Sequence, residues 1–485
     1  MKIKSFFFYN IGVKQTIFKN TFWITISDVI ARLLQFTLAI YFIRALGALE
    51  FGKFSFALAF VSTFVVFSNL GLSSITTKEL SQDSDGEKEY SSIVSLKIIL
   101  SIATLFLMLI GSFFVTQDVI IRKVIWILSC YILLNDFFMI MYAFLRARQK
   151  MEYEALFKIS QSFVTILIVF LVIINFPSIE SLSLGFLFSN IVSLIIVAIF
   201  FHFYIYKLNI NFNKVIIKKF FMLSYLLGFS TVCGAVLSNV DVVMMGHFGQ
   251  IVEAGWYNAA KQIITAVTIP SVWIFTSFFP VLSSFFKKPK EKLETVFSFY
   301  MGIMVVLALP LIIGGVVLAP KIIYFLYGAE YAPAVLAFRI LTFMAGIFFV
   351  YNPPQLLLII ANQQKKLFWV SLIGALINAF LNLILIPPFS LNGAAVSLVI
   401  TYIIMMIGFT RYSIAIIPNF IFNPMLVKIS LASMVSCLVM LGVILQPQIY
   451  KLNVVVIIII AGLAYSLVLW LFYKYGSIKK ELIKI

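Results

Sequence analysis

Six charged side chains stand in the middle of long apolar blocks of this sequence. The three bases and three acids are Arg32, Lys261, Arg339, Asp28, Asp136 and Asp241. If these blocks cross a bilayer, each charge costs at least about 2.5–3.5 kcal/mol and usually faces a cavity or a partner. Bases in a low-dielectric cavity are suited to binding anions such as phosphate, and Arg binds them through a bidentate fork.

Asp28 and Arg32 lie four residues apart, so they share one face of a helix, with the acid N-terminal to the base. Two interpretations stay open. The residues form a neutral pair that joins this helix to its neighbours, or Arg32 faces a central cavity and binds an anion while Asp28 holds its side chain.

Lys261 and Arg339 have no acidic residue at helical spacing within their own blocks. Lys261 and Arg339 are therefore candidates for a cationic cavity. Asp136 and Asp241 either neutralise those bases across helices or bind a coupling proton or sodium ion. Asp28, Asp136 and Asp241 are thus the supporting or ion-coupling residues that we expect.

The sequence contains no pattern that predicts catalysis, a metal site or ATP hydrolysis. A P-loop pattern is absent, and the two histidines are not clustered with other ligands. The three cysteines have no metal-ligand spacing, and we expect Cys130, Cys233 and Cys437 to be buried packing residues. We expect a protein that is not an enzyme, with no catalytic residues, no metal and no cofactor.

The composition is that of a membrane protein. The 485 residues are 62% hydrophobic and 11% charged, and the mean hydropathy is +1.09. This is too little charge to cover a soluble protein of this size. About 20 apolar residues cross a bilayer as a helix, and about fourteen blocks reach that length. They lie near 21–44, 53–76, 92–115, 119–144, 155–175, 183–206, 220–247, 256–285, 297–318, 332–361, 367–386, 391–412, 425–445 and 453–473. The boundaries at Pro387-Pro388 and Pro447 are the clearest, because proline does not continue a helix.

The basic residues lie between these blocks and predict the topology. One alternating set of loops, with the chain ends, holds 26 Lys and Arg, and the opposite set holds six. By the positive-inside rule the first set is cytoplasmic, and so are both termini. The net charge of +18 therefore reflects membrane topology rather than binding to nucleic acid. No interhelical loop is long enough to hold a folded domain.

A repeated motif indicates that the chain is duplicated. Glu50-Phe51-Gly52-Lys53-Phe54 is matched by Glu253-Ala254-Gly255-Trp256-Tyr257, and Gly47 and Gly249 precede the two copies. The copies are six spans apart, so both lie on the outer side and the repeat is parallel. We predict an all-α polytopic protein with six-helix lobes at 15–206 and 215–416 and two additional helices within 425–473. The residues expected at the rim are Arg44, Gly47, Glu50, Gly52, Glu253, Gly255, Tyr257 and Asn258. Arg44 has no counterpart in the second lobe, where Gly246 stands.

The motif that runs from Phe42 to Phe54, and its partner from Asn239 to Ala260, resemble those of the polysaccharide flippases. These O-antigen and capsule repeat-unit exporters belong to the multidrug/oligosaccharidyl-lipid/polysaccharide superfamily. The resemblance implies two six-helix lobes around a cationic cavity. It also implies transfer of an undecaprenyl-diphosphate-linked oligosaccharide to the outer leaflet by alternating access, coupled to H⁺ or Na⁺.

We take Arg32, Lys261 and Arg339 as the bases that would bind the diphosphate. The expected partners are the lipid-linked oligosaccharide and membrane lipids, with a polysaccharide polymerase and chain-length proteins as candidates, in the inner (plasma) membrane. The alternatives are a multidrug or cation exporter of the same superfamily, which would favour acidic residues in its cavity, a membrane enzyme of polysaccharide assembly, or a scaffold protein.

Overall fold

The protein is built from long α-helices. The computed structural model describes residues 12–82, 87–207, 211–286 and 288–475, which contain α-helices, two short 3₁₀ helices and no strand. Eleven helices in this part of the chain are long and apolar enough to cross a membrane. The protein is therefore an all-α, multi-pass membrane protein, as predicted. Both chain ends, expected in the cytoplasm, lie outside the described residues.

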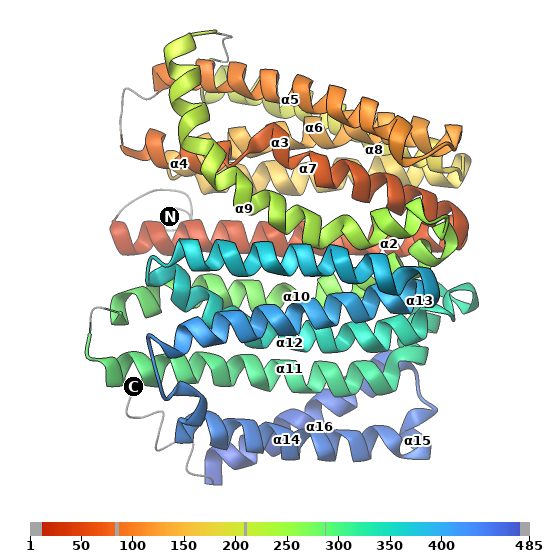
Figure 1. Cartoon of the computed structure of the whole chain (residues 1–485), viewed down its shortest axis with the longest axis vertical. Coiled ribbons are helices and arrows are strands. Elements are labelled where there is room, and N and C mark those ends of the chain that lie inside the picture. Colours follow the sequence, from red (N-terminus) through yellow and green to blue (C-terminus); the bar gives the residue numbers. More distant parts are fainter. Residues whose placement is uncertain (1–11, 83–86, 208–210, 287, 476–485) are drawn as a thin grey trace, which may run out of the picture. The chain divides into compact units, whose positions relative to one another are not determined.

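The chain divides into two compact units, Met1–Gly255 and Trp256–Ile485. The predicted lobe boundaries differ from this division and stay predictions. The helices of the first unit are α2 (Val13–Phe64), α3 (Val66–Asn69), α4 (Leu72–Gln82), α5 (Glu87–Val115), α6 (Val119–Ala147), α7 (Met151–Asn175), α8 (Ile179–Tyr204) and α9 (Lys214–His247). Within this unit α2 packs on α7 and α9, and α6 packs on α5 and α8 (Figure 1).

The second unit contains the rest of the helices. They are α10 (Ile251–Phe285), whose first residues belong to the first unit, α11 (Lys290–Tyr327), η2 (Ala329–Tyr331), α12 (Ala334–Ile360), α13 (Gln364–Ile414), η3 (Phe420–Phe422), α14 (Pro424–Leu445), α15 (Pro447–Tyr450) and α16 (Val454–Tyr475). Here α12 packs between α11 and α13, and α14 packs on α11 and α16.

The two repeat motifs have the same backbone break. Gly47 interrupts α2 with a φ of 74°, and Gly249 separates α9 from α10 with a φ of 77°. Side chains other than glycine rarely adopt these angles, so the glycine at each equivalent position permits the chain to leave one helix and begin the next. The division of α2 falls between the predicted blocks 21–44 and 53–76.

The motif glycines also pack against each other's helices. A Cβ atom on Gly52 would collide with the backbone carbonyl of Ile251, and one on Gly255 would collide with that of Ala48. Each glycine stands four residues after the carbonyl that its counterpart contacts, so the contact is reciprocal. Small residues spaced in this way let membrane helices approach closely.

Two local expectations are corrected. Pro387 and Pro388 lie inside α13, and the helix breaks at Ser390, which has a φ of 51°. Each proline removes an amide donor from the helix, and the non-helical backbone of Ser390 then divides α13 just after the pair. Cys233 and Cys437 are buried, whereas Cys130 is exposed on the outside of the unit. A thiol is apolar enough to face lipid.

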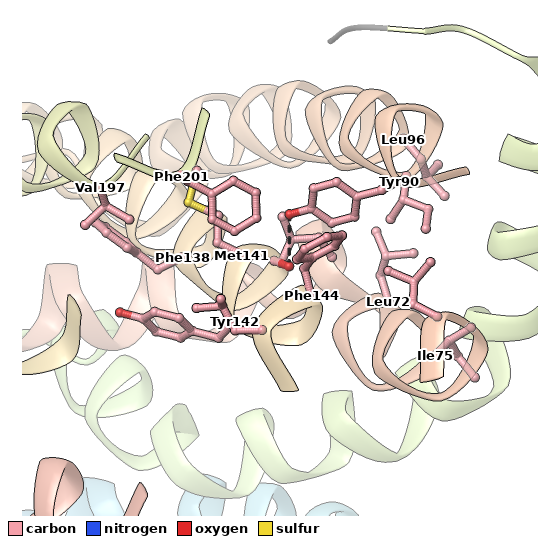
Figure 2. Close-up of a cluster of buried hydrophobic side chains, with 14 of the residues drawn as sticks. Leu72, Ile75, Tyr90, Leu96, Phe138, Met141, Tyr142, Phe144, Val197 and Phe201 are labelled. Atoms are coloured by element: carbon pink, nitrogen blue, oxygen red, sulfur yellow. Dashed lines mark hydrogen bonds between the residues drawn. The ribbon is translucent and has the colours of Figure 1, made fainter. Parts of the chain in front are cut away.

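A buried aromatic cluster organises the first unit. Figure 2 shows Tyr90 of α5 beside Phe144 of α6, with ring centroids 4.7 Å apart, and its hydroxyl donates to the carbonyl of Ile140 at 3.2 Å. Phe138 and Tyr142 of α6 extend this cluster. The cluster fixes the rotation of α6 and thereby decides which of its side chains face the neighbouring helices.

The glycine contact predicts a large effect of a single methyl group. Gly52→Ala and Gly255→Ala each place Cβ against a backbone carbonyl that cannot rotate away, so overpacking should cost roughly 1–3 kcal/mol. Thermal unfolding of the purified protein in detergent, followed by tryptophan fluorescence, should show a lower midpoint for both variants.

Gly234→Ala is the matched control, since Gly234 lies in α9 of the same unit with open space around its Cβ position. This variant should unfold at the wild-type temperature or slightly above it. An equal midpoint for Gly52→Ala and Gly234→Ala would show that the repeat contact is not close.

Candidate functional site

A polar cavity of about 430 Å³ lies within the first unit, between α2, α6 and α7. Its volume is in the range of roughly 300–1,000 Å³ that is typical of small-ligand sites. The residues that line it are Asp28, Ala31, Arg32, Gln35, Asn135, Phe138, Met139, Tyr142, Arg146, Lys158, Gln161 and Ser162.

The lining residues occupy one face of each helix. On α2 they stand at 28, 31, 32 and 35, and on α6 at 135, 138, 139, 142 and 146. Spacings of three and four place side chains on one side of an α-helix. The polar residues on these faces therefore turn toward one cavity, which is the arrangement that polar groups in a membrane require.

A continuous chain of salt bridges, called the ladder below, lies at the cavity and contains Arg146, Glu154, Lys158 and Asp28. Arg146 donates two hydrogen bonds to Glu154, at 2.8 and 2.6 Å. Lys158 lies 2.8 Å from the same carboxylate and 2.9 Å from Asp28 of α2. Glu154 is completely buried, so its negative charge must be stabilised by these two bases rather than by water. The ladder joins α2, α6 and α7 and has no net charge.

Arg32 lines the cavity as a base with no acidic partner among the described residues, and it is called the surplus base below. Asp28, its neighbour one turn earlier, binds Lys158 instead, and no ion pair or hydrogen bond of the Arg32 side chain is found in the described part of the chain. The side chain is exposed and lines the cavity. An unpaired guanidinium beside a neutral ladder gives the cavity a net positive charge.

Asp136 faces a different side of α6, about 100° from Asn135, and belongs to a second network. Its carboxylate binds the Lys97 ammonium and the Ser68 hydroxyl, and accepts a hydrogen bond from Asn69 Nδ2 at 3.1 Å. Lys97 also donates to the Ser68 carbonyl at 2.9 Å. The chain breaks directly after these residues, where Leu70 and Gly71 have φ values of 43° and 82°. The Lys97–Asp136 pair therefore holds the end of α3.

The remaining predicted charges lie elsewhere. Asp241 of α9 is completely buried in the first unit, and its Oδ1 accepts from the Val242 amide at 2.8 Å. In the second unit, Arg339 donates from Nε to the Val316 carbonyl at 3.2 Å, and the Lys261 ammonium lies 5.5 Å from the centroid of the Tyr257 ring.

The rim residues have mixed surroundings. Glu50 pairs with Lys53 at 2.7 Å, and Arg44 is exposed. Tyr257 is completely buried and Asn258 and Glu253 are half-buried. Gly47, Gly52 and Gly255 shape the backbone as described above.

Sequence reasoning missed Lys97, Glu154 and the cavity amides. Lys97 lies inside the block 92–115, and Arg146 and Lys158 indicate only topology when the sequence is considered alone. The recurrence of polar residues at 28, 32 and 35, and at 154, 158 and 161, was the signal that could have revealed two cavity-facing helices.

The fold is that of a class of membrane transporters. It superimposes on the lipid II flippase MurJ in an inward closed conformation with a TM-score of 0.76 and 18% identity, covering 93% of this chain and 98% of MurJ. A multidrug resistance MATE family transporter in an inward-facing conformation gives a TM-score of 0.67 and 14% identity, over 81% of this chain and 96% of the transporter.

The polysaccharide biosynthesis protein family matches residues 17–286, more than half of the sequence, and the chain belongs to this family. It is 23% identical over 405 residues to the capsular polysaccharide biosynthesis protein CapF of Staphylococcus aureus, covering 81% of this chain and 98% of CapF. It is also 25% identical over 177 residues to the probable low-salt glycan biosynthesis flippase Agl15 of Haloferax volcanii, covering 36% of this chain and 37% of Agl15.

The Lys97 network predicts a strong dependence of stability on charge pairing. Lys97→Met leaves the Asp136 carboxylate without its counter-ion, which should cost about 3–5 kcal/mol of folding free energy. The double variant Lys97→Met with Asp136→Leu removes both charges and should recover much of that loss. The melting temperature of each purified variant measures the effect.

Lys123→Met is the control, because Lys123 and Glu180 form a surface pair at 3.7 Å with side chains 58% and 43% exposed. Such pairs contribute about 0–1 kcal/mol. If Lys97→Met were no more destabilising than Lys123→Met, the buried pair would not hold the helix end.

Proposed function

We propose that this protein is a flippase that moves an undecaprenyl-diphosphate-linked oligosaccharide repeat unit from the cytoplasmic to the outer leaflet. The observation that carries the proposal is the surplus Arg32 in a polar cavity of a protein of the polysaccharide biosynthesis family. A diphosphate carries at least two negative charges, and a guanidinium binds two of its oxygens at once. The names of CapF and Agl15 and the fold shared with MurJ support the same substrate class.

The existing salt bridges indicate which base of this cavity would bind the diphosphate. Arg146 and Lys158 already satisfy Glu154 and Asp28, so an incoming anion gains most from Arg32. Lys261 and Arg339 are the further bases that we assign to the substrate path. The substrate would move by alternating access, in which the protein exposes its site first to one side of the membrane and then to the other.

We further propose that transport is coupled to H⁺ or Na⁺, with Asp28, Asp136 and Asp241 as the candidate carboxylates. Asp28 and Asp136 each bind a lysine, so taking up a proton there would release an ammonium group. Asp241 accepts a backbone hydrogen bond and is fully buried, so a cation reaching it must shed its water.

The proposal places the protein in the plasma membrane with both termini in the cytoplasm, acting as a transporter rather than an enzyme. A polysaccharide polymerase and chain-length proteins are the partners that would take the repeat unit after transfer.

The alternative is a multidrug or cation exporter, which the shared MATE fold supports. Such a protein would attract cations through free carboxylates, whereas the acids at the cavity are bound by lysine and arginine. A drug-susceptibility panel in cells that overexpress the protein separates the two functions. Broad protection against cationic drugs would favour the exporter.

Arg32→Ala should strongly reduce export without removing the protein from the membrane. Charge-assisted hydrogen bonds contribute about 1.5–3 kcal/mol, so transport should fall roughly 10- to 100-fold. In cells whose own gene is deleted, the lipid-linked repeat unit should accumulate in the cytoplasmic leaflet, and surface polysaccharide should fall well below the wild-type amount. Arg32→Lys keeps the charge but loses the fork, so it should restore export only in part.

Arg411→Ala is the control, since this exposed arginine lies in the last turn of α13. It should leave surface polysaccharide at the wild-type amount. Normal export by Arg32→Ala at equal protein abundance would refute the cavity assignment.

Lys261→Ala and Arg339→Ala test the two bases of the second unit. Each removes a positive charge that we assign to the substrate path, so export should drop severalfold or more in the same deletion strain. Membrane abundance is measured in parallel, because Arg339 also bonds the Val316 carbonyl and its loss could loosen α12. Normal surface polysaccharide in both variants would remove these residues from the site.

A further inference from the structure

The cavity contains a row of amides in addition to its charges. Gln161 Nε2 of α7 donates to Asn135 Oδ1 of α6 at 2.9 Å and to Asn190 Oδ1 of α8 at 3.3 Å. Asn190, which is buried, donates in turn to the Tyr131 carbonyl at 3.0 Å. These bonds fix the orientation of the amide groups of Gln161 and Asn135 toward each other.

The side of the row that faces the cavity has unused hydrogen-bonding groups. Gln161 Oε1 and Asn135 Nδ2 have no protein partner among the described residues, and neither end of the Gln35 amide has one. In the same wall the Tyr142 hydroxyl is buried and without a partner. Figure 2 shows this hydroxyl pointing away from Phe144 and Leu72 of the apolar cluster.

The Tyr142 hydroxyl is buried, and a buried polar group without a partner costs about 1–3 kcal/mol. The free amide atoms of Gln35, Asn135 and Gln161 are open to the cavity, where a ligand can reach them. Unused donors and acceptors that converge on one cavity are therefore expected where a polar ligand supplies the missing bonds.

The ligand that fits these groups is neutral and rich in hydroxyl and amide groups. Each hydroxyl of a sugar both donates and accepts, which matches neighbouring Asn135 Nδ2 and Gln161 Oε1. Gln35 lies one turn from Arg32 on the same face of α2, about 5–6 Å between Cβ atoms. A diphosphate bound at Arg32 thus brings the first sugar attached to it within reach of the amides.

We propose that Gln35, Asn135, Gln161 and Tyr142 form a subsite that recognises the sugar directly attached to the diphosphate. This inference rests on the proposed function and assigns separate parts of the substrate to separate residues. Arg32 binds the charged diphosphate, and the neutral groups distinguish the glycosylated lipid from lipids that carry phosphate alone.

The test compares two probes on the full-length protein in lipid nanodiscs. One is undecaprenyl diphosphate, and the other is the same lipid carrying a single N-acetylhexosamine. Dissociation constants are measured for wild type, Gln35→Met, Tyr142→Phe and Arg32→Ala. Gln35→Met and Tyr142→Phe remove groups that have no protein partner, so both variants should fold normally, which their melting temperatures verify.

We expect Gln35→Met and Tyr142→Phe to weaken binding of the glycosylated lipid about tenfold and to change binding of the bare lipid less than twofold. Arg32→Ala should weaken both. Gln448→Met, at an exposed glutamine of α15, should change neither.

Equal effects of Gln35→Met and Tyr142→Phe on both lipids, or no effect on either, would overturn the sugar subsite while the flippase proposal stands. Wild-type protein that binds neither lipid would overturn the proposed function, and the subsite with it.

Discussion

Charge pairing within the membrane is the constraint on which the first unit depends. An unpaired charge in a low-dielectric interior costs several kcal/mol, so nearly every base near the cavity finds an acid on another helix. Lys19 binds Glu152 at 2.9 Å and Lys158 binds Asp28 at 2.9 Å, and both pairs join α2 to α7. The Lys97–Asp136 pair joins α5 to α6 beside the break after α3. These pairs hold the helices whose faces make the cavity, and among the described bases that line the cavity they leave Arg32 unpaired.

The sequence was informative where a property is local. A glycine required by a positive φ recurs at Gly47 and Gly249, and the repeat could be seen because both copies need the same backbone break. Hydrophobic length predicted the helices, and the spacing of Asp28 and Arg32 correctly placed both on one face. The break near Pro387 was predicted within a few residues, although the chain breaks at Ser390 because the bend need not occur at the proline itself.

The sequence was uninformative where partners are distant. Lys158 and Asp28 are 130 residues apart and Lys97 and Asp136 are 39 apart. Which acid meets which base depends on helix rotation, and that rotation is set by packing such as the Tyr90–Phe144 contact rather than by any spacing within one helix. The helical spacing therefore suggested that Asp28 would hold Arg32, while tertiary packing gave Asp28 to Lys158. Helix α6 lines the cavity with Asn135 and binds Lys97 of α5 with Asp136. It can do both because these adjacent residues point about 100° apart around the helix.

The combination of one surplus base with neutral amides bears on selectivity. Every phospholipid carries phosphate, so an arginine alone would hold the wrong lipids as readily as the right one. A site built to hydrogen-bond a ligand rejects molecules that lack the matching groups, since its own polar atoms are then left unsatisfied. The Gln161–Asn135 pair can provide such rejection only if its geometry is fixed, and the bond from Gln161 to Asn190 in the buried part of α8 supplies that rigidity. Attraction by charge and selection by amides would then be independent properties of one cavity, so that sugar specificity could change through α6 and α7 while Arg32 stays the same.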